Sequence, residues 1–182
     1  MIDSSVLKLG ARELRVSSPT EEDLRKIKRK EIYFVLDNIL DTYNVGGIFR
    51  LADAIGVSKV YLCGDTETPP NTRIKKASIN TTEWVTWEYS ETAAGVIKNL
   101  KSGIKNLTAV AVEQDGESIP YTEIDYQLPI AFVVGNETTG CSKETLRACD
   151  YIAEIPMWGV NKSLNVIISL GIVAYAAVKG ID

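Results

Sequence analysis

The feature that most restricts the fold of this chain is a series of short apolar runs, rich in β-branched and aromatic residues, separated by longer mixed stretches. The runs that are predicted to be buried strands span residues 32–36, 59–62, 108–112, 130–134 and 151–155. Continuous apolar strands that alternate with helices are typical of a parallel sheet covered on both faces. We therefore expect an α/β fold with a mainly parallel sheet and helices on both faces.

The gaps between these runs leave room for the helices. Four gaps are long enough to hold one, notably at residues 45–55, 92–101 and 143–149. The stretch WVTWEY at residues 84–89 fits two interpretations, a further short strand or an exposed aromatic segment.

An additional helix is predicted near the N-terminus, in the stretch SSPTEEDLRKIKRK. Ser18 can cap it, Pro19 suits the first helical position, and Glu21 lies at capping-box spacing. Acidic residues at its start and basic residues at its end match the helix dipole. We expect residues 1–31 to form a peripheral segment with one helix and residues 32–182 to form a single domain.

The chain contains no histidine, which excludes Ser-His-Asp triads, Cys-His pairs and imidazole metal sites. Cys63, Cys141 and Cys149 show no CxxC spacing, so we expect reduced thiols and no metal. The N-terminus lacks the apolar core of a signal peptide, and the longest uncharged apolar stretch, residues 163–178, is shorter than the ~20 residues that span a bilayer. We therefore expect a cytoplasmic protein without a membrane partner.

Charge is distributed unevenly along the chain. The net charge of −4 argues against nucleic-acid binding, because contacts to phosphates dominate that affinity. Basic residues nevertheless gather in the runs LRKIKRK and TRIKK, which are either solvated helix faces or local patches that bind RNA. The residues of the second alternative are Arg25, Lys26, Lys28, Arg29, Lys30, Arg73, Lys75 and Lys76.

Ligands of open parallel sheets bind beyond the carboxyl ends of the strands, so the loops there are candidate sites. The first of these loops leads into NVGGIFRLADAIGV. Asn44 can cap the following helix, and Gly46 and Gly47 permit close backbone approach. Arg50 lies near the loop end of that helix, either as a functional cation or as half of a surface ion pair.

The second loop follows the strand in FVVGNETTG. Gly135 at the strand exit would let a flat group approach the backbone, and Glu137 either acts in a site or bonds backbone amides. No Lys-Ser/Thr pair follows the GxxxxG spacing, so Walker-A chemistry is excluded.

The third loop lies in IPMWGVNKSLNV. Ile155, Pro156 and Met157 end a strand in a restrained conformation suited to cradling an aromatic ring. Ser163 and Asn165 stand at the mouth of an apolar helix. We expect one of them to cap the helix while the other faces the cleft.

These three stretches resemble, in order and spacing, the signature motifs of the SpoU (TrmH-like) branch of the SPOUT RNA methyltransferases. The resemblance covers residues 32–178. It implies an enzyme that uses S-adenosyl-L-methionine to methylate a ribose 2′-hydroxyl of tRNA (or rRNA). It also implies a trefoil knot around residues 155–165 and a homodimer built around the knot, although knots are rare in proteins.

The resemblance also assigns residues by motif position. The implied catalytic residues are Asn44, Arg50, Glu137, Ser163 and Asn165. The implied cofactor-binding residues are Val112, Glu113, Gly135, Asn136, Ile155, Pro156, Met157, Ser163 and Leu164.

The chain departs from the family pattern at Cys141, where leucine or isoleucine is usual, and in KKASINTTEW, where a glycine is expected. A guanidinium is a poor base because its pKa lies above ~12. We therefore expect Arg50 to hold a backbone phosphate bidentately while phosphate or solvent accepts the hydroxyl proton. Two alternatives stay open: a catalytically silent knotted RNA-binding or assembly protein, and an unrelated nucleotide-binding α/β protein.

Overall fold

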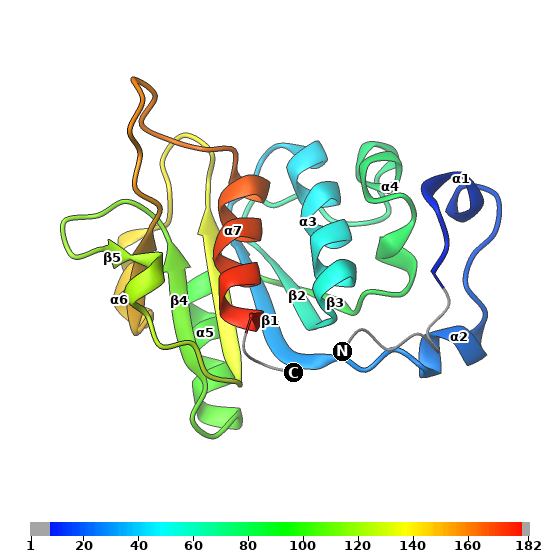
Figure 1. Cartoon of the computed structure of the whole chain (residues 1–182), viewed down its shortest axis with the longest axis horizontal. Coiled ribbons are helices and arrows are strands. Elements are labelled where there is room, and N and C mark those ends of the chain that lie inside the picture. Colours follow the sequence, from blue (N-terminus) through cyan, green and yellow to red (C-terminus); the bar gives the residue numbers. More distant parts are fainter. Residues whose placement is uncertain (1–7, 180–182) are drawn as a thin grey trace.

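The computed structural model, which describes residues 8–179, is built on one seven-stranded sheet whose strand pairs are all parallel (Figure 1). The strand order is β3-β2-β1-β6-β4-β7-β5. The strands are β1 (Lys30–Asp37), β2 (Val57–Cys63), β3 (Trp87–Ser90), β4 (Thr108–Val112), β5 (Ile119–Pro120), β6 (Ile130–Gly135) and β7 (Tyr151–Glu154). The predicted α/β fold with a mainly parallel sheet is confirmed.

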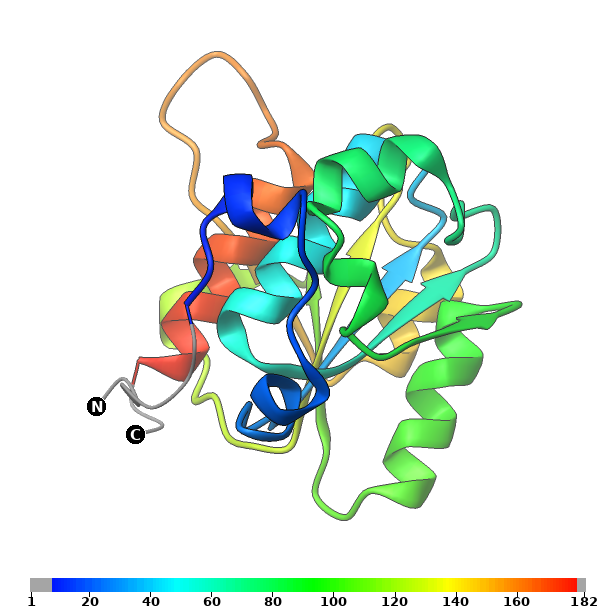
Figure 2. The same ribbon diagram turned by 90° about the vertical axis from the view of Figure 1, so that its right-hand side faces the viewer.

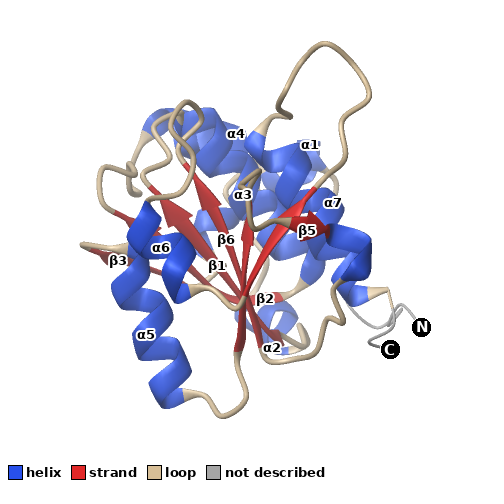
Figure 3. Cartoon of the chain, turned by 90° about the vertical axis from the view of Figure 1, so that its left-hand side faces the viewer, coloured by secondary structure: helices blue, strands red, loops and turns tan. Residues whose placement is uncertain are grey.

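Helices cover both faces of the sheet (Figure 3). The helices α3 (Thr42–Ile55), α4 (Thr72–Ser78) and α7 (Val166–Val178) lie on one face. The helices α5 (Ala93–Gly103) and α6 (Lys143–Ala148) lie on the other. Two short 3₁₀ turns, η1 (Thr81–Glu83) and η2 (Tyr121–Glu123), complete the connections.

The central strands β1 and β6 form the core of the sheet because both of their faces are buried. Ile32, Phe34 and Leu36 pack in the apolar cluster under α3 and α7, whereas Val35 belongs to the cluster under α5. Phe34 meets Phe132 of β6 edge to face, with ring centroids 6.3 Å apart. Successive side chains of a strand point to opposite faces, so burial on both sides produces the unbroken apolar runs of the sequence.

The N-terminal segment forms two short helices, α1 (Ala11–Leu14) and α2 (Glu21–Arg25), where the sequence predicts one longer helix. The cap of α2 is Thr20 rather than Ser18. The Thr20 side chain accepts the N–H of Asp23, and the Asp23 carboxylate accepts the N–H of Thr20 in return. This reciprocal pair satisfies both donors, so the helix begins after Thr20.

The same segment lies as an outer layer beyond α3 and α4 (Figure 2). Asn80 donates from Nδ2 to the carbonyl of Leu14 at 2.7 Å, and Ser18 donates to Glu83 at 3.0 Å. The segment is therefore attached mainly at η1 and the end of α4.

The predicted strands agree with the observed ones to within two residues at each end. The sequence prediction missed α4 and β5 as elements. Helix α4 spans only seven residues, and β5 is a two-residue edge strand that ends in proline, so neither is long enough for a periodic pattern. Within the described residues, no helix is long and apolar enough to cross a membrane.

Candidate functional site

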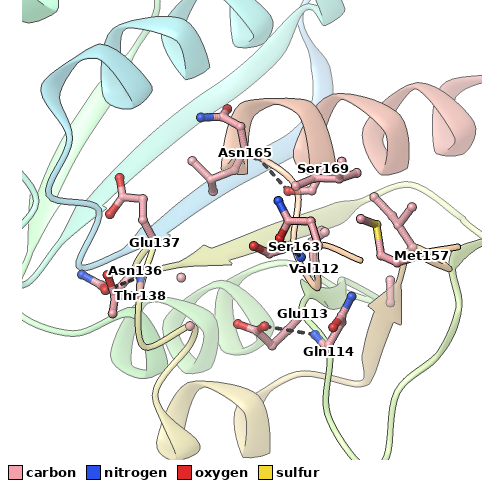
Figure 4. Close-up of a pocket in the computed structure, with 17 residues that line it drawn as sticks. Val112, Glu113, Gln114, Asn136, Glu137, Thr138, Met157, Ser163, Asn165 and Ser169 are labelled. Carbon is pink, nitrogen blue, oxygen red and sulfur yellow. Dashed lines mark hydrogen bonds between the residues drawn. The ribbon is translucent and has the colours of Figure 1, made fainter. Parts of the chain in front are cut away.

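A pocket of about 440 Å³ lies at the carboxyl edge of the sheet, where β4, β6 and β7 end beside the start of α7 (Figure 4). Eight of the nine expected cofactor residues line it: Val112, Glu113, Gly135, Asn136, Ile155, Met157, Ser163 and Leu164. Pro156 does not line it. The loops after β4, β6 and β7 therefore converge on one cavity.

Glu137, in the loop after β6, joins that loop to the one after β1. Its Oε1 accepts the N–H of Asp41 at 3.1 Å and Nδ2 of Asn44 at 2.8 Å, and its Oε2 accepts the N–H of Leu40 at 3.2 Å. Partial burial acts to raise the pKa of Glu137, but the hydrogen bonds from Asn44 and the backbone outweigh it and lower the pKa. Glu137 is thus a carboxylate near neutral pH that accepts three hydrogen bonds from the loop after β1 and the start of α3.

Asn165 extends these contacts to α7. Its Oδ1 accepts the N–H of Ile167 at 2.9 Å and caps the helix, while its Nδ2 donates to Oδ1 of Asn44 at 3.0 Å. Asn44 therefore donates at one end of its amide and accepts at the other. We call Glu137, Asn44 and Asn165 the carboxylate–amide network. Asn165 is therefore the expected cap, but it lines the pocket together with Ser163, so the two roles are not divided between the two residues.

The expectation that Asn44 caps α3 is wrong. Asp41 is the cap, because its Oδ1 accepts the N–H of Tyr43 at 2.8 Å. Asn44 is buried in the first helical turn, where its amide is available to the network. The following Gly46 packs against α4, and Gly47 packs against the Ile167 side chain of α7. The lack of side chains at these two glycines therefore allows close helix packing.

Gly135 lines the pocket, and its lack of a side chain also serves the loop itself. A Cβ on Gly135 would overlap the backbone of Gly140 and Cys141, so only glycine lets the loop fold back on itself. Two carboxylates hold the closed loop. Glu113 accepts the N–H of Cys141 at 2.9 Å, and the buried Asp37 accepts the N–H of Ser142 at 3.0 Å.

The third loop presents its main chain to the pocket. From residue 157 to residue 164 no backbone–backbone hydrogen bond occurs within the described part of the chain. The N–H of Ser163 is bound by Oδ1 of Asn161 at 3.2 Å. Apart from this N–H, the main-chain groups of Met157, Asn161, Ser163 and Leu164, which line the pocket, have no hydrogen-bond partner within the described residues. Figure 4 shows Glu137 and Met157 on opposite sides of the pocket, with Ser163 between them.

Arg50 lies outside the pocket in this single chain. The residue is exposed on α3 and does not belong to the pocket lining. Its helical neighbours Ile48, Phe49 and Ala52 are fully buried against the sheet, so Arg50 occupies the opposite face of the helix.

The basic residues near the N-terminus are largely paired within the chain. Arg25 and Lys26 form exposed ion pairs with Glu21 and Glu22 at 3.2 and 3.1 Å. Arg29 is partly buried beside Asp53, at 3.8 Å, and donates to the carbonyl of Trp84. Lys28 is exposed, and Lys30 begins β1.

The second basic run lies on α4. Arg73 and Lys76 are exposed, and Lys75 pairs with Glu83 at 3.0 Å. Figures 1 and 2 place α2 at the end of the sheet where the strands begin and α4 at the end where they finish. Only the run on α4 therefore lies at the same end as the pocket.

Four polar pocket residues were not among the expected ones: Gln114, Thr138, Asn161 and Ser169. Gln114 and Thr138 directly follow Glu113 and Glu137 at strand exits, so the strand-exit rule could have found them. Ser169 lies one helical turn after Asn165, a spacing that places both on one side of α7.

The chain matches the model of the SpoU rRNA Methylase family over residues 31–175. A tRNA (guanosine(18)-2′-O)-methyltransferase of Aquifex aeolicus is 33% identical over 156 residues, which are 82% of this chain and 70% of that protein. A 23S rRNA (guanosine-2′-O-)-methyltransferase of Ralstonia nicotianae is 29% identical, over 93% of this chain and 67% of its own length.

The solved structures agree. An AdoMet-bound rRNA methyltransferase from Sinorhizobium meliloti superposes with a TM-score of 0.75 at 29% identity, over 87% of this chain and 60% of that one. The family model spans well over half of the chain. Two of the three motif loops line the pocket, and the first is joined to them through Asn44. This chain therefore belongs to the SpoU rRNA methylase family.

Proposed function

We propose that this chain is an S-adenosyl-L-methionine-dependent methyltransferase that modifies a ribose 2′-hydroxyl of tRNA or rRNA. The observation that carries the proposal is the carboxylate–amide network, which ties three sequence-distant motif loops together beside one pocket. Because both named relatives act on guanosine ribose, we propose guanosine as the methylated nucleotide.

The pocket fits the expected cofactor in size and in chemistry. Its volume of about 440 Å³ lies in the range of small-molecule sites, ~300–1,000 Å³. The free main-chain groups between residues 157 and 164 suit the edge of an adenine, and the apolar Val112, Ile155 and Leu164 suit its faces. S-adenosyl-L-methionine, when bound, supplies a methyl group already activated by its sulfonium. We propose that Gly135, Ile155 and Leu164 hold it through their main chain.

The residues of this chain then have to position the ribose hydroxyl. In-line attack on an activated methyl group requires placement more than acid–base power, so positioning supplies most of the rate. We propose that Glu137 and Asn44 hold the loop after β1 in place and that Asn165 keeps the pocket mouth open at α7. Ser163, exposed and on the pocket wall, is the hydroxyl best placed to orient the substrate.

We propose that Arg50 holds an RNA phosphate bidentately and that phosphate or solvent takes the hydroxyl proton. In the single chain Arg50 stands outside the pocket, so this role requires the RNA or a second subunit to bring the two together. Arg50→Lys keeps the charge but loses the planar fork. Full turnover of Arg50→Lys on native RNA would rule out the bidentate role.

We propose a homodimer that packs through α7, where Ile168 and Tyr175 are 53% and 52% exposed on an otherwise apolar helix. Sedimentation of the wild-type protein and of Ile168→Asp tests this, since a carboxylate on that face should release monomers. The trefoil knot around residues 155–165 and the cytoplasmic location stay predictions.

Two measurements test the function itself. Transfer of tritiated methyl groups from S-adenosyl-L-methionine into total RNA should be detected and should disappear with Asn44→Ala. Calorimetry should show binding of S-adenosylhomocysteine in preference to ATP or NAD. Cofactor binding without incorporation would support the catalytically silent RNA-binding protein, and preference for ATP or NAD would support an unrelated nucleotide-binding protein.

A further inference from the structure

The loop between β7 and α7 carries an exposed indole at the rim of the pocket. The loop projects beyond the carboxyl edge of the sheet in Figures 1, 2 and 3. Trp158 is 93% exposed and Val160 is fully exposed, so neither contributes to the core. Met157 and Asn161, which flank this pair along the chain, both line the pocket. The indole therefore belongs to the loop that forms one wall of the pocket.

The surroundings of the indole favour a nucleic acid as its partner. Lys162, exposed and four residues along the same loop, supplies a cation for a phosphate. Glu137 lies across the pocket from Met157 in Figure 4, and the lining also includes Glu113; the charge of these carboxylates repels phosphate. An RNA strand that reaches the pocket is therefore favoured on the side of Trp158 and Lys162.

The chemistry of the substrate supplies the second step. A ribose that enters a pocket of this kind leaves its stacked neighbours, and the bases beside it lose a stacking partner. Exposed aromatic side chains replace such partners in proteins that bind single-stranded or looped RNA. An indole offers the largest stacking face of any side chain, and glycine at position 159 leaves its loop free to adjust.

We propose that Trp158 stacks on an unpaired base next to the methylated nucleotide, and that Lys162 contacts the adjoining phosphate. The inference rests on the proposed function, since it names how the same site receives its RNA. Trp158 is then a specificity residue that favours unpaired over helical RNA.

Steady-state kinetics on unmodified tRNA transcripts tests the stacking contact. Stacking by one aromatic residue corresponds to about 5- to 160-fold in affinity. Trp158→Ala should raise KM for the RNA at least about fivefold, with kcat and the affinity for S-adenosylhomocysteine changed less than about twofold. Trp158→Phe should recover most of the loss. Tyr89→Ala removes a ring that is 50% exposed on β3 and lies outside the pocket lining, so it should leave KM unchanged.

A second assay needs no methyl transfer. A single-stranded RNA 12-mer should quench the fluorescence of the wild-type protein, and the quench should be lost in Trp158→Phe, which keeps Trp84 and Trp87. A 12-mer of abasic ribose phosphates should not quench. Equal quenching by the abasic strand, or an unchanged KM in Trp158→Ala, would overturn the proposal.

Two further outcomes distinguish a failure of the RNA contact from a failure of the proposed function. If the emission of Trp158 depended on protein concentration rather than on RNA, and if Trp158→Ala sedimented as a smaller species, a second copy of the chain would cover the indole. This result would overturn the proposed RNA contact. RNA-dependent quenching without methyl transfer would support the contact while contradicting the proposed function.

Discussion

Replacement of Glu137 by glutamine tests whether the carboxylate–amide network holds the site together. The carboxylate accepts three hydrogen bonds, from the N–H groups of Leu40 and Asp41 and from Asn44. Glutamine has one acceptor oxygen, and its amide would place a donor against a donor. Hydrogen bonds to a charged group are worth ~1.5–3 kcal/mol each, but Glu137 is exposed, so solvent compensates part of the loss. We expect a cost of about 1–2 kcal/mol.

The cost should depend on pH with a definite sign. The folded pKa of Glu137 lies below its ordinary value of 4.5, so the folded state favours the charged form. Its stabilisation is fully present above the unfolded pKa and is lost as pH falls through the folded pKa. The difference between the wild-type protein and Glu137→Gln should therefore be constant at neutral pH and shrink from about pH 4.5 downward.

Thermal unfolding followed by circular dichroism provides the measurement. A loss of about 1–2 kcal/mol in a chain of this size lowers Tm by about 2–8 °C. Glu91→Gln, an exposed carboxylate outside the pocket lining, is the matched control and should melt like the wild-type protein. If Glu137→Gln melted with the control, or if its deficit persisted unchanged at pH 3.5, the network would not be the support described.

Three further outcomes follow from the same contacts. Asn165→Asp keeps the oxygen that caps α7 but places a second oxygen against Oδ1 of Asn44, so its Tm should stay within about 2 °C of wild type while calorimetry shows weaker binding of S-adenosylhomocysteine. Asn165→Ala should weaken that binding and should also lose about 1 kcal/mol of stability, because the cap is removed. Gly140→Ala introduces a Cβ at φ +69° against the carboxylate of Glu113, so the free energy of unfolding measured in urea should fall by about 2 kcal/mol. Gly116→Ala is the control and should be near neutral, because the space around Gly116 is open. Burial raises the pKa of Cys63 and of Cys149 to about 12, so iodoacetamide at pH 8 should label these thiols slowly in the folded protein and within minutes in urea. Equal labelling rates in the two conditions would contradict the burial.

The sheet and its covering helices were predictable because local pattern and global burial agree. β1 and β6 are buried on both faces, and the same apolar runs specify them in the sequence. The capping role at α7 was also predictable, since serine and asparagine at a helix mouth have few other uses. The short α4 and β5 were not, because a two-residue strand at the sheet edge leaves no periodicity.

The site was predictable in its loops but not in its contacts. The loops that follow the strands were the right ones to search. Asn44 and Glu137 are 93 positions apart, however, and no local pattern indicates that the Asn44 amide bonds both Glu137 and Asn165. The role of Gly135 within its own loop was not predictable for a similar reason. The atoms that exclude a side chain there belong to Gly140 and Cys141 of its own loop, which the sequence cannot place in space. The sequence also did not indicate that Arg50 lies outside the pocket lining of the single chain.

Hydrogen exchange with and without S-adenosylhomocysteine tests most directly whether the loops after β4, β6 and β7 form one cofactor site. At saturation, peptides that cover residues 111–115, 134–141 and 155–166 should gain protection together, while those from residues 8–29 should not change. Protection confined to one of these loops, or centred on the N-terminal segment, would contradict the account.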